Sequence, residues 1–294
     1  MRRPPISRPS SAAVLIATLL ATAGNAQPTD PFQLNAVQQA YLDQVLSSWE
    51  IESGKVTTFN CPFTRWDYNA FGPARDIAFS VDEGQVSYQQ PDKGSFRITQ
   101  ISRWVPKPVA PGQAPPQGAP QGQHVVQPDA IGEHWVCDGR SVFEFKHDQK
   151  VLRVQPIPPA MQGKAIVDGP LPFLFGAKAE KLKQKYRMFI KEPPPSPEII
   201  QIVAQPRTQE LAANYRGVEL QLDKRRMLPV GMQVWQPDGS RSVYLFDLER
   251  ASVNARRDRL WGALFQSPRT PRGWKRVDEP LPTRQAAAPA QPAR

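Results

Sequence analysis

The residues that could carry out chemistry in this chain are few. Its 294 residues include two cysteines, Cys61 and Cys137, and three histidines, His124, His134 and His147. Two cysteines are too few for a four-cysteine zinc site or an iron–sulfur cluster. No two histidines have the H-x-x-x-H spacing of a zinc hydrolase. Neither a metal site nor a bound cofactor is therefore expected.

Three carboxylates lie close together in the sequence, at Asp76, Asp82 and Glu83. A pair of carboxylates could catalyse glycoside hydrolysis. Here, however, they fall at predicted strand ends and in a predicted turn over 82–84, where carboxylates usually cap the backbone or face water. The chain also lacks a G-x-S-x-G sequence, a P-loop, a dinucleotide fingerprint and a C-x-x-C-H sequence. We therefore expect a protein that is not an enzyme.

The first 26 residues have the features of a secretory signal peptide. Arg2, Arg3 and Arg8 precede an apolar run, Ala12–Ala23, which is followed by small residues up to Ala26. A basic start, a short apolar run and a small-residue cleavage site are typical of export, whereas a membrane span needs about 20 apolar residues. We expect cleavage after Ala26 and a periplasmic mature protein.

Export changes the interpretation of the two cysteines. Cys61 lies in the strand-like stretch Thr57–Arg65, and Cys137 ends the stretch His134–Cys137. In an oxidising compartment this placement favours a disulfide between Cys61 and Cys137, with two free buried thiols as the alternative. A nucleophilic pair of Cys61 with His134 would lack both an orienting acid and an oxyanion motif.

The chain is basic, with 37 Lys and Arg against 27 Asp and Glu. Its net charge of +10 falls to +7 when the three arginines of the leader are removed. The densest basic clusters, at 178–187, 224–226 and 256–259, are short and scattered, unlike the basic runs of nucleic-acid binders. We expect a solvated basic surface that attracts lipid headgroups or acidic partners, and no binding to nucleic acid.

Residues 34–51 give the best helix candidate. Apolar residues recur there mostly at steps of three and four, which places them on one face of a helix; they are Leu34, Val37, Ala40, Tyr41, Val45 and Trp49. Gly54 marks the end of this helix. The charged stretch Ala177–Tyr186 is compatible with a second, shorter helix.

Most of the remaining chain alternates apolar and polar residues in short runs, separated by turn residues such as 91–94, 138–139 and 236–239. Period-two runs joined by short turns predict an antiparallel meander with one apolar face. We count about ten or eleven strands. So large a sheet must curl, and few helices are available to cover it. The predicted fold class is therefore mainly β (α+β): an incomplete, half-open antiparallel β-barrel with an N-terminal amphipathic helix.

Proline is enriched, at 33 of 294 residues, and several prolines lie where packing residues are absent. Residues 105–123 are predicted to form an exposed proline-rich loop inserted in the meander. Residues 278–294 are predicted to be a disordered tail. The predicted organisation is thus a signal peptide over 1–26, one half-barrel domain over 27–277, and the tail.

Several elements follow one another in an informative order. They are an amphipathic helix ending near Trp49, a strand and bend over 84–98, a strand–Asp-Gly–strand segment over 135–143, an apolar segment at 169–176 and an ending with Pro271–Lys275. In this order the chain resembles a divergent member of the outer-membrane lipoprotein carrier family, the LolA-like proteins. The resemblance implies a half-open barrel that carries lipoprotein acyl chains, with inner- and outer-membrane envelope proteins as partners.

The resemblance also implies a lid segment, formed here by the apolar residues Leu171, Phe173, Leu174 and Phe175. In the family, an arginine before a proline holds the lid through backbone contacts. This chain has Gln90 at that position, so Gln90 is the candidate for the lid contact, with a weaker, uncharged hydrogen bond.

A carrier of acyl chains needs a concave apolar surface, because each buried methylene contributes about 0.8 kcal/mol and a long tail can bind without polar contacts. The alternation of the strands predicts that ten residues line that surface: Phe79, Val86, Tyr88, Phe96, Ile98, Ile101, Phe143, Phe145, Leu152 and Val154. The alternative is that these residues form an ordinary filled core.

The leading hypothesis is an exported, soluble carrier or sensor, expected to be a monomer, that binds lipoprotein acyl chains or lipid reversibly in the half barrel. The second is a non-enzymatic regulatory or structural envelope protein that binds a protein partner through the same fold. A third, an enzyme that acts on glycans or polymers, would need a polar cleft with carboxylates, which the sequence does not indicate.

Overall fold

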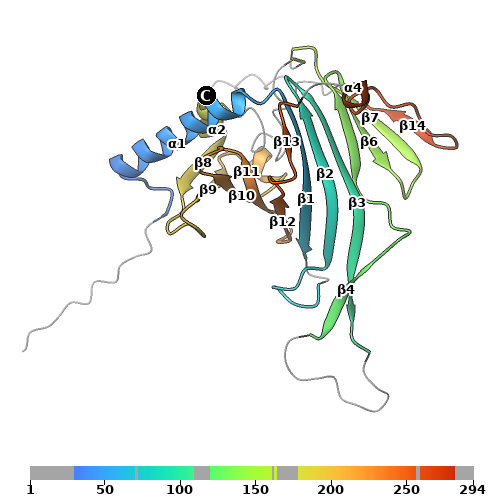
Figure 1. Ribbon diagram of the computed structural model, residues 1–294, viewed down its shortest axis with the longest axis horizontal. Helices are drawn as coiled ribbons and strands as arrows, with labels where there is room; N and C mark the ends of the chain where they lie inside the picture. The colour runs from blue at the N-terminus through green and yellow to red at the C-terminus, as the bar shows by residue number, and fades with distance from the viewer. Residues whose placement is uncertain are drawn as a thin grey trace, which may run out of the picture.

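The computed structural model describes residues 30–69, 72–108, 120–160, 162–163, 178–255 and 259–281. Within these ranges the chain forms one large, curved β-sheet with four helices (Figure 1). The helices are α1 (Ala36–Gly54), α2 (Ala179–Lys185), α3 (Gln209–Ala212) and α4 (Arg259–Ala263). The strands are β1 (Thr58–Tyr68), β2 (Ser80–Gln89), β3 (Lys93–Pro106), β4 (Gly122–Val126), β5 (His134–Asp138), β6 (Ser141–Lys146), β7 (Val151–Pro156), β8 (Tyr186–Ile190), β9 (Ile199–Pro206), β10 (Gly217–Asp223), β11 (Pro229–Trp235), β12 (Arg241–Phe246), β13 (Ser252–Val253) and β14 (Lys275–Asp278).

The strands pair in the order β14-β7-β6-β5-β3-β2-β1-β12-β11-β10-β9-β8, with β13 also beside β1 and β4 also beside β3. Every pair is antiparallel except β14 with β7. The two ends of this order, β14 and β8, are not paired with each other, so the sheet is open. The predicted fold, a mainly β half-open barrel with an N-terminal helix, is confirmed.

The number of strands is larger than predicted, at fourteen in the described ranges. The additional strands include β4, β13 and β14, which have only five, two and four residues. Runs this short contain too few alternations to be recognised in a sequence. The predicted turn over 82–84 is also wrong, because these residues lie inside β2.

The helix α1 begins with a capping box. The Asn35 side chain accepts a hydrogen bond from the Gln38 backbone N–H at 2.9 Å, and the Asn35 N–H donates to the Gln38 side chain at 3.0 Å. The predicted apolar face is wrong at three positions, since Val37 is 78% and Tyr41 38% exposed and Ala40 is exposed as well. The first turns of α1 extend past β8, where no strand covers them (Figure 1). The buried positions are Leu42, Val45, Leu46, Trp49 and Ser53.

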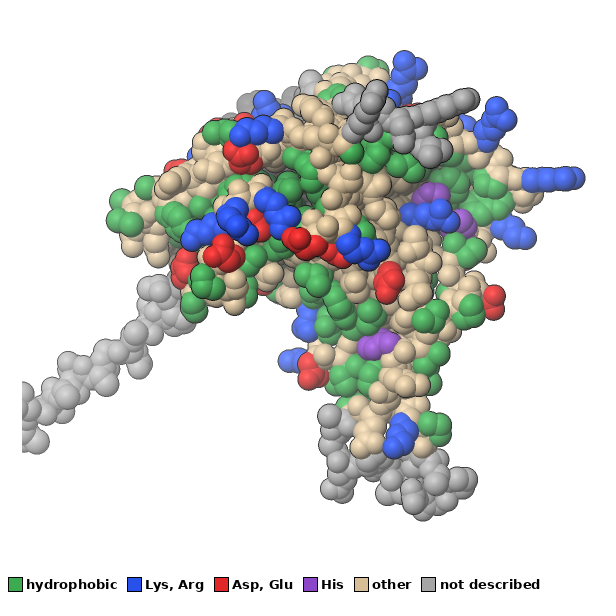
Figure 2. Space-filling view, in the orientation of Figure 1, with side chains coloured by type: hydrophobic (Ala, Val, Ile, Leu, Met, Phe, Trp, Pro, Cys, Tyr) green, Lys and Arg blue, Asp and Glu red, His purple; other side chains and the backbone are tan. Residues whose placement is uncertain are grey.

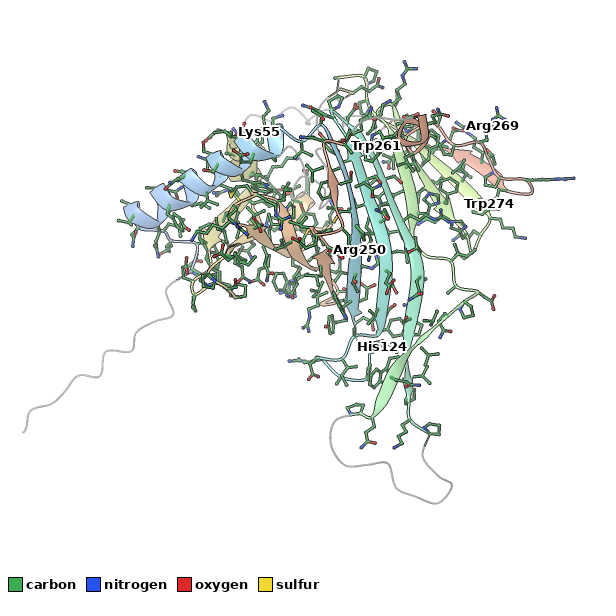
Figure 3. All side chains as sticks on the ribbon, viewed as in Figure 1. Lys55, His124, Arg250, Trp261, Arg269 and Trp274 are labelled. Atoms are coloured by element: carbon green, nitrogen blue, oxygen red, sulfur yellow. The ribbon has the colours of Figure 1, made fainter. Side chains whose placement is uncertain are left out.

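The proline-rich insertion is shorter than the predicted 105–123. Val105 pairs with Gln123 and Pro106 with Gly122, so both ends of the predicted loop belong to the β3–β4 ladder. This ladder projects from the body of the sheet and carries His124 (Figures 1 and 3). Residues 109–119 lie outside the described residues.

The strand register assigns side chains to two faces, because residues directly opposite each other point to the same side of a sheet. The inner face packs against α1 and carries the main core, which includes Cys61, Phe63, Phe96 and Leu220. Along this face Cys61 lies opposite Val86, and Val86 opposite Phe96.

A second, smaller core lies on the outer face of β6 and β7. Phe143, Leu152 and Val154 form it, and Phe145 and Trp274 pack against them. Trp274 comes from the C-terminal segment, just before β14 (Figure 3). Figure 2 shows Lys and Arg side chains projecting over the part of the molecule that holds β7 and β14. The predicted tail starts within this region, because Asp278 is the last residue of β14; residues 282–294 lie outside the described ranges.

Among the described residues, no helix is both long enough and apolar enough to cross a membrane. The predicted signal peptide, residues 1–26, lies outside these ranges.

Candidate functional site

Five of the ten residues predicted to line a concave surface do lie together on the inner face. They are buried, and they belong to the main core with α1: Val86, Tyr88, Phe96, Ile98 and Ile101. Phe79 lies just before β2 and is half-buried beneath the Arg103 guanidinium, 4.9 Å from its ring centre.

The other four, Phe143, Phe145, Leu152 and Val154, lie on the outer face and are not part of the inner wall. Phe143 is opposite Val136, which is itself opposite Ser95. Trp135, the neighbour of Val136, is opposite Phe96 and therefore points inward. Successive side chains alternate between faces, so Val136 and Phe143 point outward. Alternation identified these residues as buried, but at β6 and β7 the buried face is the outer one, and the other face carries Glu144 and the exposed Arg153 and Gln155.

A row of stacked aromatic rings crosses the inner wall. The ring centroids of Phe63 and Phe96 are 4.8 Å apart, and those of Phe96 and Trp135 5.7 Å. Phe63 is on β1 and Phe96 on β3, so the ring of Phe63 passes over β2, where Gly84 lies directly opposite it. A Cβ at Gly84 would lie only 2.4 Å from Phe63 Cζ. The glycine thus makes the stacking across three strands possible.

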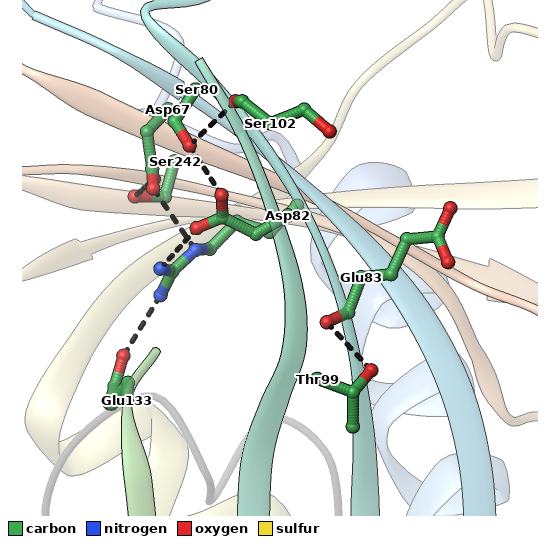
Figure 4. A network of polar contacts seen from close by, with 9 residues as sticks. Asp67, Ser80, Asp82, Glu83, Thr99, Ser102, Glu133 and Ser242 are labelled. Atoms are coloured by element: carbon green, nitrogen blue, oxygen red, sulfur yellow. Dashed lines mark hydrogen bonds and ion pairs between the residues drawn. The ribbon is translucent and has the colours of Figure 1, made fainter. Parts of the chain in front are cut away.

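A polar network occupies another part of the inner face (Figure 4). The Arg65 guanidinium lies between three carboxylates, at 3.0 Å from Asp67, 2.8 Å from Asp82 and 2.9 Å from Glu133. Burial raises the pKa of Asp67, and the nearby positive charge of Arg65 opposes that change.

Hydroxyl groups complete the network. Ser242 donates to Asp67 at 2.6 Å, and Ser80 donates to Asp82. Each carboxylate is thus engaged by a cation or a hydroxyl, which indicates a structural tie rather than an acid–base pair. A turn predicted over 82–84 does not indicate this cluster, because Asp82 lies inside β2. The period-two pattern that runs through β2 was the available signal.

The two cysteines are free thiols. Cys61 on β1 and Cys137 on β5 are separated by β2 and β3, about 14 Å at the usual spacing of strands. A disulfide requires Cα atoms within about 7 Å, so the predicted bond between Cys61 and Cys137 is wrong.

The thiols are also poor nucleophiles. Burial, with a contribution from Asp247, raises the pKa of Cys61 to about 12, and burial raises the pKa of Cys137 to about 11. His134 is on the outer face, stacked on Phe145 at 4.2 Å between ring centres, and cannot activate Cys61.

The lid residues Leu171, Phe173, Leu174 and Phe175 lie outside the described residues. Gln90 is exposed at the end of β2, and its backbone N–H donates to Thr57 O at 2.9 Å. A nearby residue that the sequence analysis did not single out, Asp92, is buried and accepts a hydrogen bond from Gly163 N at 2.5 Å. Asp92 thus joins the β2–β3 turn to the chain that follows β7.

Histidine, cysteine and carboxylate side chains do not gather into a group of three or more that could hold a metal ion anywhere in the described ranges.

No family model and no curated protein matches this chain. Several solved structures match it. An uncharacterized conserved protein from Thermus thermophilus is 11% identical, with a TM-score of 0.42, and the match covers 82% of this chain and 100% of that one. A LolA superfamily protein from Nitrosomonas europaea is 10% identical, with a TM-score of 0.32 and coverage of 75% and 96%. The MucA/MucB complex of Pseudomonas aeruginosa gives 14% identity, a TM-score of 0.35 and coverage of 78% and 61%.

The structures that this chain is similar to include members of the LolA superfamily, the family that its order of sequence elements resembles. Identities and TM-scores this low carry no argument about function, so the proposals below are based on the residues of this chain.

Proposed function

We propose that this protein is an exported, non-enzymatic carrier or sensor that binds an acyl chain, free or attached to a lipoprotein, against the inner face of β1, β2, β3 and β5. The support is the mismatch between this apolar wall and the one long helix that could cover it. α1 packs along β8 and α2, at one end of the strand order.

The dimensions make the mismatch clear. A helix of 19 residues is about 28 Å long and about 10 Å wide. The twelve strands that lie side by side in the sheet span about 53 Å across the strands. One helix cannot cover such a sheet alone, and Phe96 and Ile98, which are 8% and 4% exposed, are buried in one core with α1 and with residues of other strands such as Leu220 and Phe246. An acyl chain would bind there by replacing part of this packing, because its methylenes gain free energy from contact with any apolar surface.

A buried donor without an acceptor supports a ligand that carries a carbonyl group. Trp49 of α1 is only 1% exposed, and its indole N–H has no hydrogen-bond acceptor among the described residues. An unmade hydrogen bond in an apolar interior is unfavourable by roughly 1 to 3 kcal/mol. The ester or amide carbonyl of an acylated ligand would supply the acceptor.

The test is to purify the mature chain from the cell envelope and to look for bound lipid by native mass spectrometry and solvent extraction. We expect a co-purified acylated molecule and displacement of a fluorescent acyl probe. Phe96→Leu on the inner wall should weaken probe binding, whereas Phe145→Leu on the outer face should not. Failure to find lipid, together with failure to bind the probe, would refute the carrier proposal.

A second candidate function, binding of a protein partner, is favoured by one feature of the surface. Val105, Val125 and Val126 on the projecting β3–β4 ladder, and Ile131 in the connection after it, are exposed large apolar residues. Exposed apolar residues gathered on one projection are typical of an interaction site. The double variant Val125→Ser with Val126→Ser should then lose a stoichiometric partner that the exposed control Val37→Ser retains.

A further inference from the structure

A small cavity of 180 Å³ lies between the N-terminal segment, α1, α2 and β8. Its most buried lining residues are Leu42, Tyr186 and Met188, which form an apolar floor. Phe32 and Leu34, from the segment just before α1, complete the apolar part of the lining. This cavity is at the β8 end of the sheet, far along the strand order from the wall formed by β1, β2, β3 and β5.

Three cations line the same cavity, and its lining includes no carboxylate. Lys183 is balanced from outside the lining by Asp43, at 3.0 Å. Arg187 is balanced by Asp30 at 2.6 Å, and its guanidinium lies 4.5 Å from the ring centre of Phe32. The third cation is Arg207, which directly follows β9.

Arg207 is held in place but is not neutralised. Its Nε donates to two backbone carbonyls, Lys183 O at 2.9 Å and Tyr186 O at 3.1 Å. Its terminal nitrogens, Nη1 and Nη2, make no hydrogen bond or ion pair with any residue in the described ranges. A guanidinium fixed at Nε with both terminal nitrogens available is arranged to bind a carboxylate or phosphate through two parallel hydrogen bonds.

We propose that this cavity binds a small amphipathic anion, with its carboxylate or phosphate on Arg207 and a short apolar body on Leu42 and Met188. The volume limits the size of the ligand. The cavity measures 180 Å³. That space fits a headgroup and a few carbons, not a tail of about 16 carbons. The proposal does not depend on the carrier function.

The experiment is a calorimetric titration of the mature chain with hexanoate and with hexyl phosphate. We expect at least one of them to bind, hexylammonium not to bind, and acetate to bind at least about tenfold more weakly than hexanoate because it lacks the apolar body. Decyl phosphate should bind no more than a few-fold more tightly than hexyl phosphate. A steep gain with chain length would overturn the assignment of a small ligand.

Two variants test whether the Arg207 side chain binds the anion. Arg207→Gln should weaken binding of the anion at least about tenfold, since two charge-assisted hydrogen bonds are lost. Arg225→Gln, an exposed arginine in the turn after β10, is the matched control and should bind like the unmodified chain. Circular dichroism confirms that both variants are folded. Equal affinity of a folded Arg207→Gln variant, or no binding of either anion to the unmodified chain, would overturn the proposal.

Discussion

Arg65 and Asp82 form an ion pair across the β1–β2 ladder, with 2.8 Å between Nη2 and Oδ2. The two residues are directly opposite each other in the register, and Asp82 is only 2% exposed. The net stabilisation from such a buried ion pair is small, because both charges lose their hydration. Removing one partner is much more destabilising, because the other charge is then buried without compensation. Arg65 is also the cation that Asp67 and Glu133 share.

We therefore expect Arg65→Met to lower the free energy of unfolding by about 3 kcal/mol at neutral pH. Urea denaturation measures this value. The matched control is Arg187→Met, which removes a half-exposed partner of Asp30 and should cost less than about 1 kcal/mol. Equal losses in the two variants would mean that burial of the Arg65 network does not matter.

The outer-face histidines predict a dependence of stability on pH. Burial lowers the pKa of His134 to about 4, with further lowering by Arg97 and His147. The unfolded chain, with a histidine pKa near 6.5, binds the proton first as pH falls, so stability is lost between about pH 6.5 and pH 4. Because the ring is partly open to solvent, we expect a loss of about 1 to 2 kcal/mol.

Urea titrations from pH 7.5 down to pH 4.5 would follow this loss. The variant His134→Phe keeps an aromatic ring against Phe145 and should flatten the slope. If His134→Phe retains the full slope, then the histidine is not its source.

The sequence predicted the curled, open sheet because alternation and turn residues are local signals. It could not predict which face of each strand points inward. Phe143 and Phe96 both have the sequence pattern of core residues, but they lie on opposite faces of the sheet. On β5, which lies between them, Trp135 is opposite Phe96 and Val136 is opposite Phe143. Each face has its own core.

The Arg65 network was missed for a related reason. A charged residue in an alternating strand is normally assigned to the solvent side. Arg65 and Asp82 point inward because each neutralises the other there. Such pairing depends on register between strands, which a single sequence does not contain.

The buried face of α1 gives a direct test of packing. Leu46 is fully buried within the main core, whereas Val37 is 78% exposed. Leu46→Ala should lower the free energy of unfolding by about 2 to 4 kcal/mol through lost contacts and the cavity left behind. Val37→Ala should change it by less than about 0.5 kcal/mol. The same urea experiment compares them, and a large effect at Val37 would contradict the observed helix face.

The glycine beneath the aromatic row is the next point to test. A Cβ at Gly84 would meet Phe63 Cζ at 2.4 Å and the Arg97 carbonyl oxygen at 2.6 Å, and the second of these is backbone that cannot rotate away. Gly84→Ala should therefore cost about 1 to 3 kcal/mol of stability. Gly54→Ala is the matched control, because a Cβ there has no neighbour within 4 Å. A stable Gly84→Ala variant would mean that Phe63 does not cross β2 as described.

The separation of the two cysteines predicts the redox state of the protein. Cys61 and Cys137 are on strands that are not neighbours, and both thiols are buried with raised pKa values, so neither forms a bond or reacts readily with oxidants. A thiol reagent added to the folded protein should react slowly, and the same reagent in guanidinium chloride without reductant should count two thiols per chain. The variant Cys137→Ala should give one thiol per chain under the same conditions. A count of zero in the denatured, unreduced chain would require a disulfide, and with it a different arrangement of β1, β2, β3 and β5.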